Sequence, residues 1–425
     1  MLRVSVASDL EEVTLTAQAA FSKRSWPFVL SMAIPWILCA GQRSIRRLAC
    51  MGGLRRSASA YYRFLSEGKW RAAILFRSLL ELIVETFGIE ELTLVLDDTL
   101  CPKWGRQIYG TASYFDHVRR PRPGFIWGHN WIVLAVVIRA SGRAAVALPF
   151  WIRLYRPKEQ CSPGEFRTRH EIVAGALHLV RALFPGRIRL LADGAYANRS
   201  LVGPLQGLGI RLVSRLRKDA CLRAPTPPRR AKGVRGRKPR YGGRLGKLNS
   251  LARSTSCFRK QRVSIYGKDV DLLVRVFEAY WPALDQVIKV VITRDPKRPK
   301  RLAYLFSTDT EMTAVEIVES FAQRWTIEQL FSVAKNQMGL DSAEVRKRLS
   351  VMRHATLCMA LITWTEVWAY RRSPRTWARP FTQKLASLRS ETITSTVFAS
   401  GPRTRGSGRI ARRLGELFTR ATAVA

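Results

Sequence analysis

The sequence has few acidic residues for its length. It contains 31 aspartates and glutamates against 72 lysines and arginines, which gives a formal net charge of +41 and a pI near 11.2. A chain this cationic favours a polyanionic partner, and nucleic acid is the first candidate. Apolar residues make up 47% of the 425 positions. A sizeable core can therefore form, and global disorder is excluded.

Long hydrophobic runs and paired cysteines are also missing. The longest apolar stretch near the N-terminus, residues 28–40, is shorter than the ~20 residues that span a bilayer. The seven cysteines are scattered and form no CxxC pair. This pattern argues against a disulfide framework or a zinc site and for a reducing cytosol. Neither a GxSxG elbow nor a P-loop occurs, which disfavours a serine hydrolase and an ATP-driven machine.

The first ninety residues are predicted to be helical, because their apolar positions recur at helical spacing. Basic residues and aromatics alternate between Arg43 and Arg77. Such helices can lie along phosphates or enter a groove of DNA. The alternative is a solvated basic face over an ordinary helical core.

From residue 91 the apolar residues follow strand-like patterns. Strands are predicted at residues 91–97, 131–140, 145–155, 187–193 and 210–216, and helices at 164–184 and 198–208. A basic arm rich in proline and glycine precedes four more strands, at residues 262–266, 269–277, 286–293 and 301–306. A capping box at Thr313 and Glu316 begins a helix that runs to residue 338, and a second long helix covers residues 343–370.

This order of elements is that of a ribonuclease H-like core, an α/β fold with a mixed five-stranded sheet and flanking helices. Five divisions are predicted along the chain. They are a helical DNA-binding domain (1–90), the first part of the core (91–216), a basic arm with a mostly β insertion (217–300), the second part of the core with the catalytic helix (301–372), and a basic, loosely held C-terminal tail (373–425).

Three acidic residues occupy matching places in this order. Asp97 ends the first predicted strand, Asp193 ends the fourth, and Glu328 lies on the helix after the insertion. The first and fourth strands of such a sheet are parallel neighbours, so these carboxylates are expected to meet at one edge. Converging carboxylates need cations between them, and hard oxygen ligands suit Mg²⁺ or Mn²⁺. With two ions, the three residues become candidate metal ligands and catalytic residues for phosphodiester chemistry. Any one of them alone could instead be a surface carboxylate or a helix cap.

The predicted catalytic helix also carries two cations. Arg324, Glu328 and Lys335 share one stripe, because eleven steps of about 100° return to within about 20° of the start. An arginine grips phosphate with two donors and a lysine acts as a point charge, so both are candidate DNA-binding residues. The alternative is an ordinary Arg–Glu salt bridge on a solvated face.

The helix resembles a signature of bacterial insertion-sequence transposases, in which Tyr, Arg, Glu and Lys are separated by two, three and six residues. The matching segment is Phe321-Ala-Gln-Arg324-Trp-Thr-Ile-Glu328-Gln-Leu-Phe-Ser-Val-Ala-Lys335, with phenylalanine in place of tyrosine. The family's two Asp motifs are resembled by Leu94-Val-Leu-Asp97-Asp98-Thr99 and Leu191-Ala-Asp193-Gly194-Ala-Tyr196. Because Asp-x-Thr fits the family, we favour Asp97 as the first metal ligand. Asp98 is the alternative, since neighbouring side chains point to opposite sides of a strand.

The resemblance implies a DDE transposase with two divalent ions, Mg²⁺ or Mn²⁺. Such an enzyme cuts double-stranded DNA at the terminal inverted repeats of its element and joins the freed 3′-hydroxyls to target DNA. It also implies a homodimer in a synaptic complex and a cytoplasmic, nucleoid-associated bacterial protein. In related enzymes a tryptophan of the insertion holds a flipped base. Trp281 is the candidate for this DNA contact, and a place in the core is its alternative.

Two other functions fit part of these observations. A catalytically inactive, DNA-binding descendant of a transposase would keep the basic surfaces, but three intact acids argue against it. Another ribonuclease H-like nuclease, such as a resolvase or an RNA–DNA hybrid nuclease, is disfavoured by the Arg-Glu-Lys helix and by the 134 residues between Asp193 and Glu328. Cleavage of specific terminal repeats would separate these possibilities.

Overall fold

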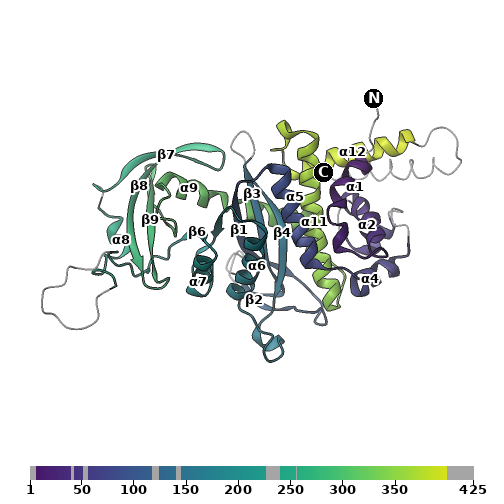
Figure 1. Ribbon diagram of the computed structural model, residues 1–425, viewed down its shortest axis with the longest axis horizontal. Coiled ribbons are helices and arrows are strands. Elements are labelled where there is room, and N and C mark those ends of the chain that lie inside the picture. The colour runs from purple at the N-terminus through teal and green to yellow at the C-terminus, as the bar shows by residue number, and fades with distance from the viewer. Residues whose placement is uncertain are drawn as a thin grey trace.

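One mixed sheet runs through the computed structural model (Figure 1), which describes residues 6–39, 43–50, 56–116, 124–139, 145–225, 240–254 and 256–399. Within these residues the sheet has ten strands in the order β2-β3-β1-β5-β6-β10-β9-β8-β7, with β4 paired to β3. The strands are β1 Glu91–Pro102, β2 Ala112–Asp116, β3 Gly124–Arg139, β4 Ala145–Tyr155, β5 Arg187–Ala192, β6 Ile210–Arg215, β7 Arg259–Ile265, β8 Lys268–Trp281, β9 Gln286–Asp295 and β10 Arg298–Ser307.

The first half of the sheet has the pairing of a ribonuclease H-like α/β fold, which confirms the predicted fold class. β1 is antiparallel to β3 and parallel to β5, and β5 is parallel to β6. The parallel strands are connected through the helices α6 (Arg169–Leu183) and α7 (Arg199–Gly207). A capping box, in which Thr168 and Glu171 bond each other's backbone amides, begins α6.

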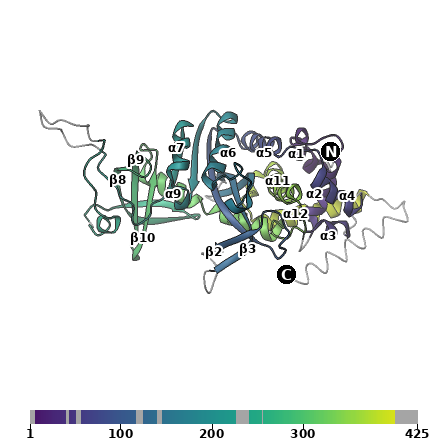
Figure 2. The same cartoon turned by 90° about the horizontal axis from the view of Figure 1, so that it is seen from below.

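The strand β2 was not predicted, and β3 begins seven residues earlier than expected. Its first part pairs with β2 as a hairpin from Ala112↔Gly128 to Asp116↔Gly124. Phe115 and Phe125 lie opposite each other there and are both exposed. The hairpin extends away from the main body of the sheet (Figure 2). Aromatic residues lie on both faces of β2, with Tyr114 buried and Phe115 exposed, so the sequence shows no clear alternation of apolar and polar residues and the strand was missed.

The insertion is a direct extension of the core sheet. β7, β8, β9 and β10 form an antiparallel meander, and β10 also pairs with β6 from Leu305↔Arg215 to Ser307↔Val213. The same strand therefore ends the insertion and adds a sheet position to the core. Residues 226–239 of the predicted basic arm lie outside the described residues.

The helix α11 (Arg348–Arg372) organises the other end of the molecule. It is buried along most of its length and packs against β4 and against helices from both ends of the chain (Figure 1). The N-terminal helices are α1 Val6–Leu15, α2 Trp26–Leu38, α3 Ile45–Cys50, α4 Ala58–Glu67 and α5 Ala72–Phe87. The Arg353 guanidinium donates to the carbonyl oxygens of Leu65 (2.9 Å) and Gly68 (2.6 Å), where α4 ends and its carbonyls lack helical partners. The predicted N-terminal helices are thus confirmed, and they share one core with the sheet.

The segment after residue 373 is not loosely held throughout, in contrast to the prediction. Its helix α12 (Phe381–Ala399) buries Leu385 and Leu388. Lys384 forms an ion pair of 2.6 Å with Glu366 of α11, and both side chains are almost fully buried. Because the segment is mostly basic, its few buried apolar residues did not stand out in the sequence. Residues 400–425 lie outside the described residues.

The buried Lys384–Glu366 pair yields a stability prediction. Lys384→Met should lower the free energy of unfolding by about 3–5 kcal/mol, because it leaves a buried carboxylate without its counter-ion. The double variant Lys384→Met/Glu366→Leu should recover most of that loss, because no buried charge remains. Urea unfolding of the two variants and the wild type measures both effects. Equal losses in the single and double variants would contradict the assigned role of the pair.

Candidate active site

The parallel pairing of β1 with β5 brings two of the predicted acids together. The paired residues run from Glu91↔Arg187 to Leu96↔Ala192, and Asp97 and Asp193 are the next residues on each strand. Asp193 directly follows β5, which ends one residue earlier than predicted. Asp97 does not end β1, which continues to Pro102 through its pairing with β3. The pairing of β1 with β5, however, ends at Leu96, directly before Asp97.

The turn after β5 keeps Asp193 in place. Asp193 precedes a single 3-10 turn, Gly194–Tyr196. A side chain at Gly194 would bring its Cβ to 3.0 Å from the carbonyl oxygen of Arg215 on β6. Only glycine allows this close approach without a shift, so the Asp-Gly order in the sequence has a steric reason.

The predicted catalytic helix is confirmed as helical, but it is not continuous. It consists of α9 (Ala314–Gln323), which begins with the predicted capping box, α10 (Thr326–Ser332) and a π-helical turn, η4 (Val333–Gln337). Trp325 lies at the break between the two helices and is 47% exposed. π turns often occur at functional sites, and this one contains Lys335.

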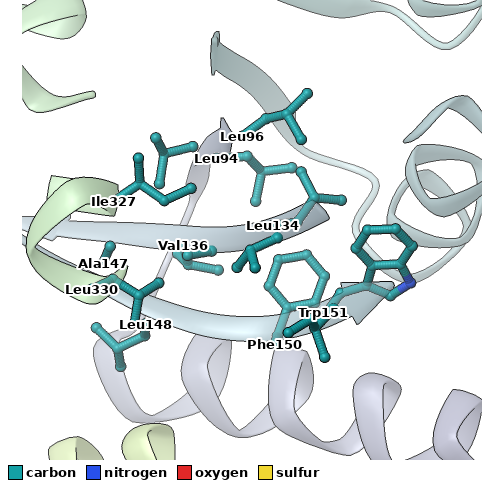
Figure 3. Close-up of a cluster of buried hydrophobic side chains, with 14 of the residues drawn as sticks. Leu94, Leu96, Leu134, Val136, Ala147, Leu148, Phe150, Trp151, Ile327 and Leu330 are labelled. Atoms are coloured by element: carbon teal, nitrogen blue, oxygen red, sulfur yellow. The ribbon is translucent and has the colours of Figure 1, made fainter. Parts of the chain in front are cut away.

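Apolar contacts fix α10 on the sheet. Ile327 and Leu330 are buried in one cluster with side chains of β1, β3 and β4, among them Leu96, Val136 and Ala147 (Figure 3). Glu328 lies between these two anchors in the sequence and is therefore held at the sheet while its carboxylate stays partly exposed.

Arg324 connects the helix to β1. One guanidinium nitrogen, Nη1, lies 2.9 Å from Oδ2 of Asp97, and the other, Nη2, lies 2.8 Å from Oε1 of Glu328. The ammonium of Lys335 donates to the carbonyl oxygen of Leu100 on the same strand, at 2.8 Å. Arg324, Glu328 and Lys335 thus face β1 together, as the stripe predicted, even though the helix is broken and partly π-helical.

Burial dominates the electrostatics of Asp97. It raises the pKa of this carboxyl to about 7, against the opposing effects of the Arg324 guanidinium and of the Asp98 amide, which donates to Oδ1 at 2.9 Å. The neighbouring carboxylates of Asp98 and Asp193 raise the pKa further. Burial and the neighbouring carboxylates both disfavour the ionised form of Asp97, and a cation in contact with it would stabilise that form.

Asp98 faces a different group of residues. Its Oδ1 accepts a hydrogen bond of 3.1 Å from the buried Tyr196 hydroxyl, and its Oδ2 lies 3.8 Å from a guanidinium nitrogen of Arg169. Asp97, and not Asp98, shares a partner with Glu328. Sequence reasoning assigned no role to Tyr196 or Arg169. The aromatic in the second Asp motif was a signal for Tyr196, whereas Arg169 at the start of α6 had none.

The carboxylates at this edge have the donor chemistry of a divalent-cation site, although they are not gathered around one point in this structure. Asp97 and Glu328 already share one positive group, the Arg324 guanidinium, and Asp193 adjoins Asp97 by strand register. Carboxylate oxygens are the ligands that Mg²⁺ and Mn²⁺ prefer. Across the part of the chain that the structure describes, no three acidic, histidine or cysteine side chains are grouped closely enough to hold a metal ion.

Trp281 lies away from these residues, at the end of β8. It is 7% exposed and packs edge-to-face on Phe306, with ring centroids 5.2 Å apart. Its burial agrees with the alternative, a tryptophan of the core, and its contact with DNA stays a prediction.

Comparison with known families supports this geometry. A family model of DDE superfamily endonucleases matches residues 19–266, which is more than half of the chain. The chain belongs to the DDE superfamily endonucleases. Residues 246–368 match the model of an archaeal transposase, ISC1217. A search of curated proteins finds no match.

The two matched segments of this DDE endonuclease contain Asp97, Asp193 and Glu328. They identify it as a DDE transposase of an insertion sequence, and hence as a transposase-like nuclease that acts on DNA. Enzymes of this superfamily generally use divalent metal ions. Among the described helices, none has the length and apolar character needed to cross a membrane.

The raised pKa of Asp97 predicts a pH dependence of stability. In the metal-free DDE endonuclease the pKa of Asp97 in the folded state, about 7, lies above the ordinary value of an aspartate, 3.8. Asp97 therefore favours the fold at low pH relative to high pH, and this contribution is lost as the pH rises through 7. The free energy of unfolding of the wild type should therefore fall by roughly 2–4 kcal/mol between pH 5 and pH 9 because of this group, and Asp97→Asn should remove that fall.

Urea unfolding in the presence of a chelator, at several pH values, measures this difference. The wild type should lose stability relative to Asp97→Asn as the pH rises. Parallel pH profiles for the two proteins would show that the Asp97 carboxyl is not raised in the fold.

Proposed function

We propose that this DDE endonuclease cleaves DNA at the ends of its insertion sequence and transfers the freed 3′-hydroxyls to target DNA. The observation that carries the proposal is the convergence of three elements on one place. Arg324 joins Asp97 of β1 to Glu328 of α10, and Asp193 follows β5 beside Asp97. Carboxylates that lie close together in a partly buried site repel each other and destabilise the fold unless they bind a cation.

Asp97, Asp193 and Glu328 are the residues proposed to hold two divalent ions, Mg²⁺ or Mn²⁺. When bound, such ions activate a water or a 3′-hydroxyl and stabilise the leaving oxygen of a phosphodiester. The half-buried position of the carboxylates excludes bulk water from one side of the site. Asp97 is preferred over Asp98 because it faces Glu328, whereas the hydroxyl of Tyr196 holds Asp98 on the other side of the strand.

Arg324 and Lys335 are proposed to bind the DNA backbone. Both contact β1 from the side of α10: Arg324 contacts Asp97, and Lys335 contacts Leu100. A guanidinium can bind a phosphate through two parallel hydrogen bonds, and an ammonium adds a point charge. The proposed partners are the terminal inverted repeats and the target DNA at the bacterial nucleoid. The proposed working form is a homodimer that holds two ends.

A cleavage assay tests the proposal. The substrate is the DNA that flanks the gene, with Mg²⁺ or Mn²⁺. The wild type should nick at a repeat boundary, and Glu328→Gln should lower the rate at least about 1,000-fold, since the metal-assisted chemistry is worth several kcal/mol. DNA binding should change less than about threefold and should weaken steeply with salt in both proteins, because phosphate contacts release counter-ions.

Glu319→Gln is the matched control. Glu319 lies on α9 and accepts the Ser264 amide at 2.8 Å, a bond that glutamine can also accept, so its cleavage should equal that of the wild type. Normal cutting by Glu328→Gln would overturn the assignment of Glu328. Tight binding by the wild type without cleavage under either metal would favour a non-catalytic, DNA-binding descendant.

A further inference from the structure

The Arg324 side chain lies where a cation would have to lie. Its two terminal nitrogens contact one carboxylate oxygen of Asp97 and one of Glu328, at 2.9 and 2.8 Å. The other oxygen of Asp97 accepts the amide of Asp98. Both oxygens of Asp97 are therefore engaged within the chain, and one of the two Glu328 oxygens is engaged as well.

The Arg324–Asp97 ion pair is partly shielded from solvent, whereas the Arg324–Glu328 pair is more open, because the Glu328 side chain is 36% exposed. The side chain of Arg324 is 16% exposed, and that of Asp97 is 21% exposed. A partly buried pair is screened less by water and salt than a surface pair. Lys335, the other cation on this face, bonds the carbonyl oxygen of Leu100 and has no described bond to these carboxylates. Arg324 is thus the cation that compensates Asp97 and Glu328 in this structure.

The backbone around Arg324 also differs from that of a regular helix. Between α9 and α10 the amides bond three residues back, as in Arg324 to Phe321 (3.1 Å) and Ile327 to Arg324 (3.1 Å). Such 3-10 segments have weaker hydrogen-bond geometry than an α-helix and often mark hinges. The guanidinium can therefore be displaced without unwinding a continuous helix.

We propose that Arg324 is an internal counter-ion that closes the metal site until DNA binds. In the free protein it neutralises Asp97 and Glu328 and competes with divalent cations for the same oxygens. A phosphate of bound DNA offers the guanidinium two acceptor oxygens, draws it away and releases both carboxylates. This inference rests on the proposed function, since it takes Asp97, Asp193 and Glu328 as the metal ligands.

The coupling is reciprocal. If DNA raises the affinity for divalent cations by removing Arg324, then the cations raise the affinity for DNA by the same factor. A nuclease built in this way acquires its metal ions together with its substrate, and it is inactive towards DNA that does not reach Arg324. Regulation of this kind suits an enzyme that cuts the chromosome of its own host.

The test is the binding of Mn²⁺, measured by electron paramagnetic resonance of the free ion. Without DNA, Arg324→Ala should bind Mn²⁺ at least tenfold more tightly than the wild type. Lys335→Ala is the control: it removes one positive charge nearby without freeing a carboxylate, and its affinity should rise less than threefold. Equal or weaker binding by Arg324→Ala would overturn the proposal. Arg324→Gln replaces the alanine variant if that variant does not fold.

The second arm adds a short duplex that carries the end of the element. The duplex should raise the Mn²⁺ affinity of the wild type and leave that of Arg324→Ala nearly unchanged, after the binding of Mn²⁺ to the duplex alone is subtracted. An equal gain in both proteins would mean that DNA acts without Arg324, which overturns the proposal.

Two further variants separate this proposal from the proposed function. Arg324→Ala/Glu328→Gln and Arg324→Ala/Asp193→Asn should each lose the Mn²⁺ affinity that Arg324→Ala gains. If neither loses it, these carboxylates are not metal ligands, and the proposed function fails with the inference. If both double variants bind Mn²⁺ more weakly than Arg324→Ala, while Arg324→Ala itself binds like the wild type, the metal site stands and only the closing role of Arg324 is wrong.

Discussion

The parallel pairing of β1 with β5 is the constraint on which the active site depends. It places Asp97 and Asp193 at the same level because Leu96 and Ala192 are the last paired residues. A slip of one residue would turn one of these side chains to the other face of the sheet. The register is held by buried residues such as Leu94, Leu96 and Leu190, which are inaccessible to solvent. The hydrophobic core therefore decides where two carboxylates meet.

Charge balance is the second requirement of the site. The chain has a large excess of basic residues, yet the carboxyl of Asp97 is so buried that its pKa rises. A general positive field does not stabilise a buried carboxylate as well as one cation in direct contact. Arg324 supplies that contact in the structure and is attached through α10 to the same core that fixes β1. The packing of the apolar core thus also fixes the positions of the charged groups of the site.

Long-range packing unites segments that look separate in the sequence. α11 contacts helices from both ends of the chain, and β10 joins the insertion to the core sheet. Local patterns correctly predicted most of these helices and strands, because periodicity depends only on neighbouring residues. They could not show that α12 is attached by the buried Lys384–Glu366 pair. A single buried ion pair between residues 18 positions apart produces no periodic pattern in the sequence.

The sequence by itself determined the family, the fold class and the order of the three acids, since these follow from residue type, spacing and the succession of strands and helices. It also predicted that Arg324, Glu328 and Lys335 share a face. Tertiary structure alone decided that Asp97 faces Arg324 while Asp98 faces Tyr196. It also decided that Trp281 is buried against Phe306 and that the predicted catalytic helix breaks at Arg324. The direction of a side chain and the continuity of a helix depend on what packs against them, and those partners come from distant parts of the chain.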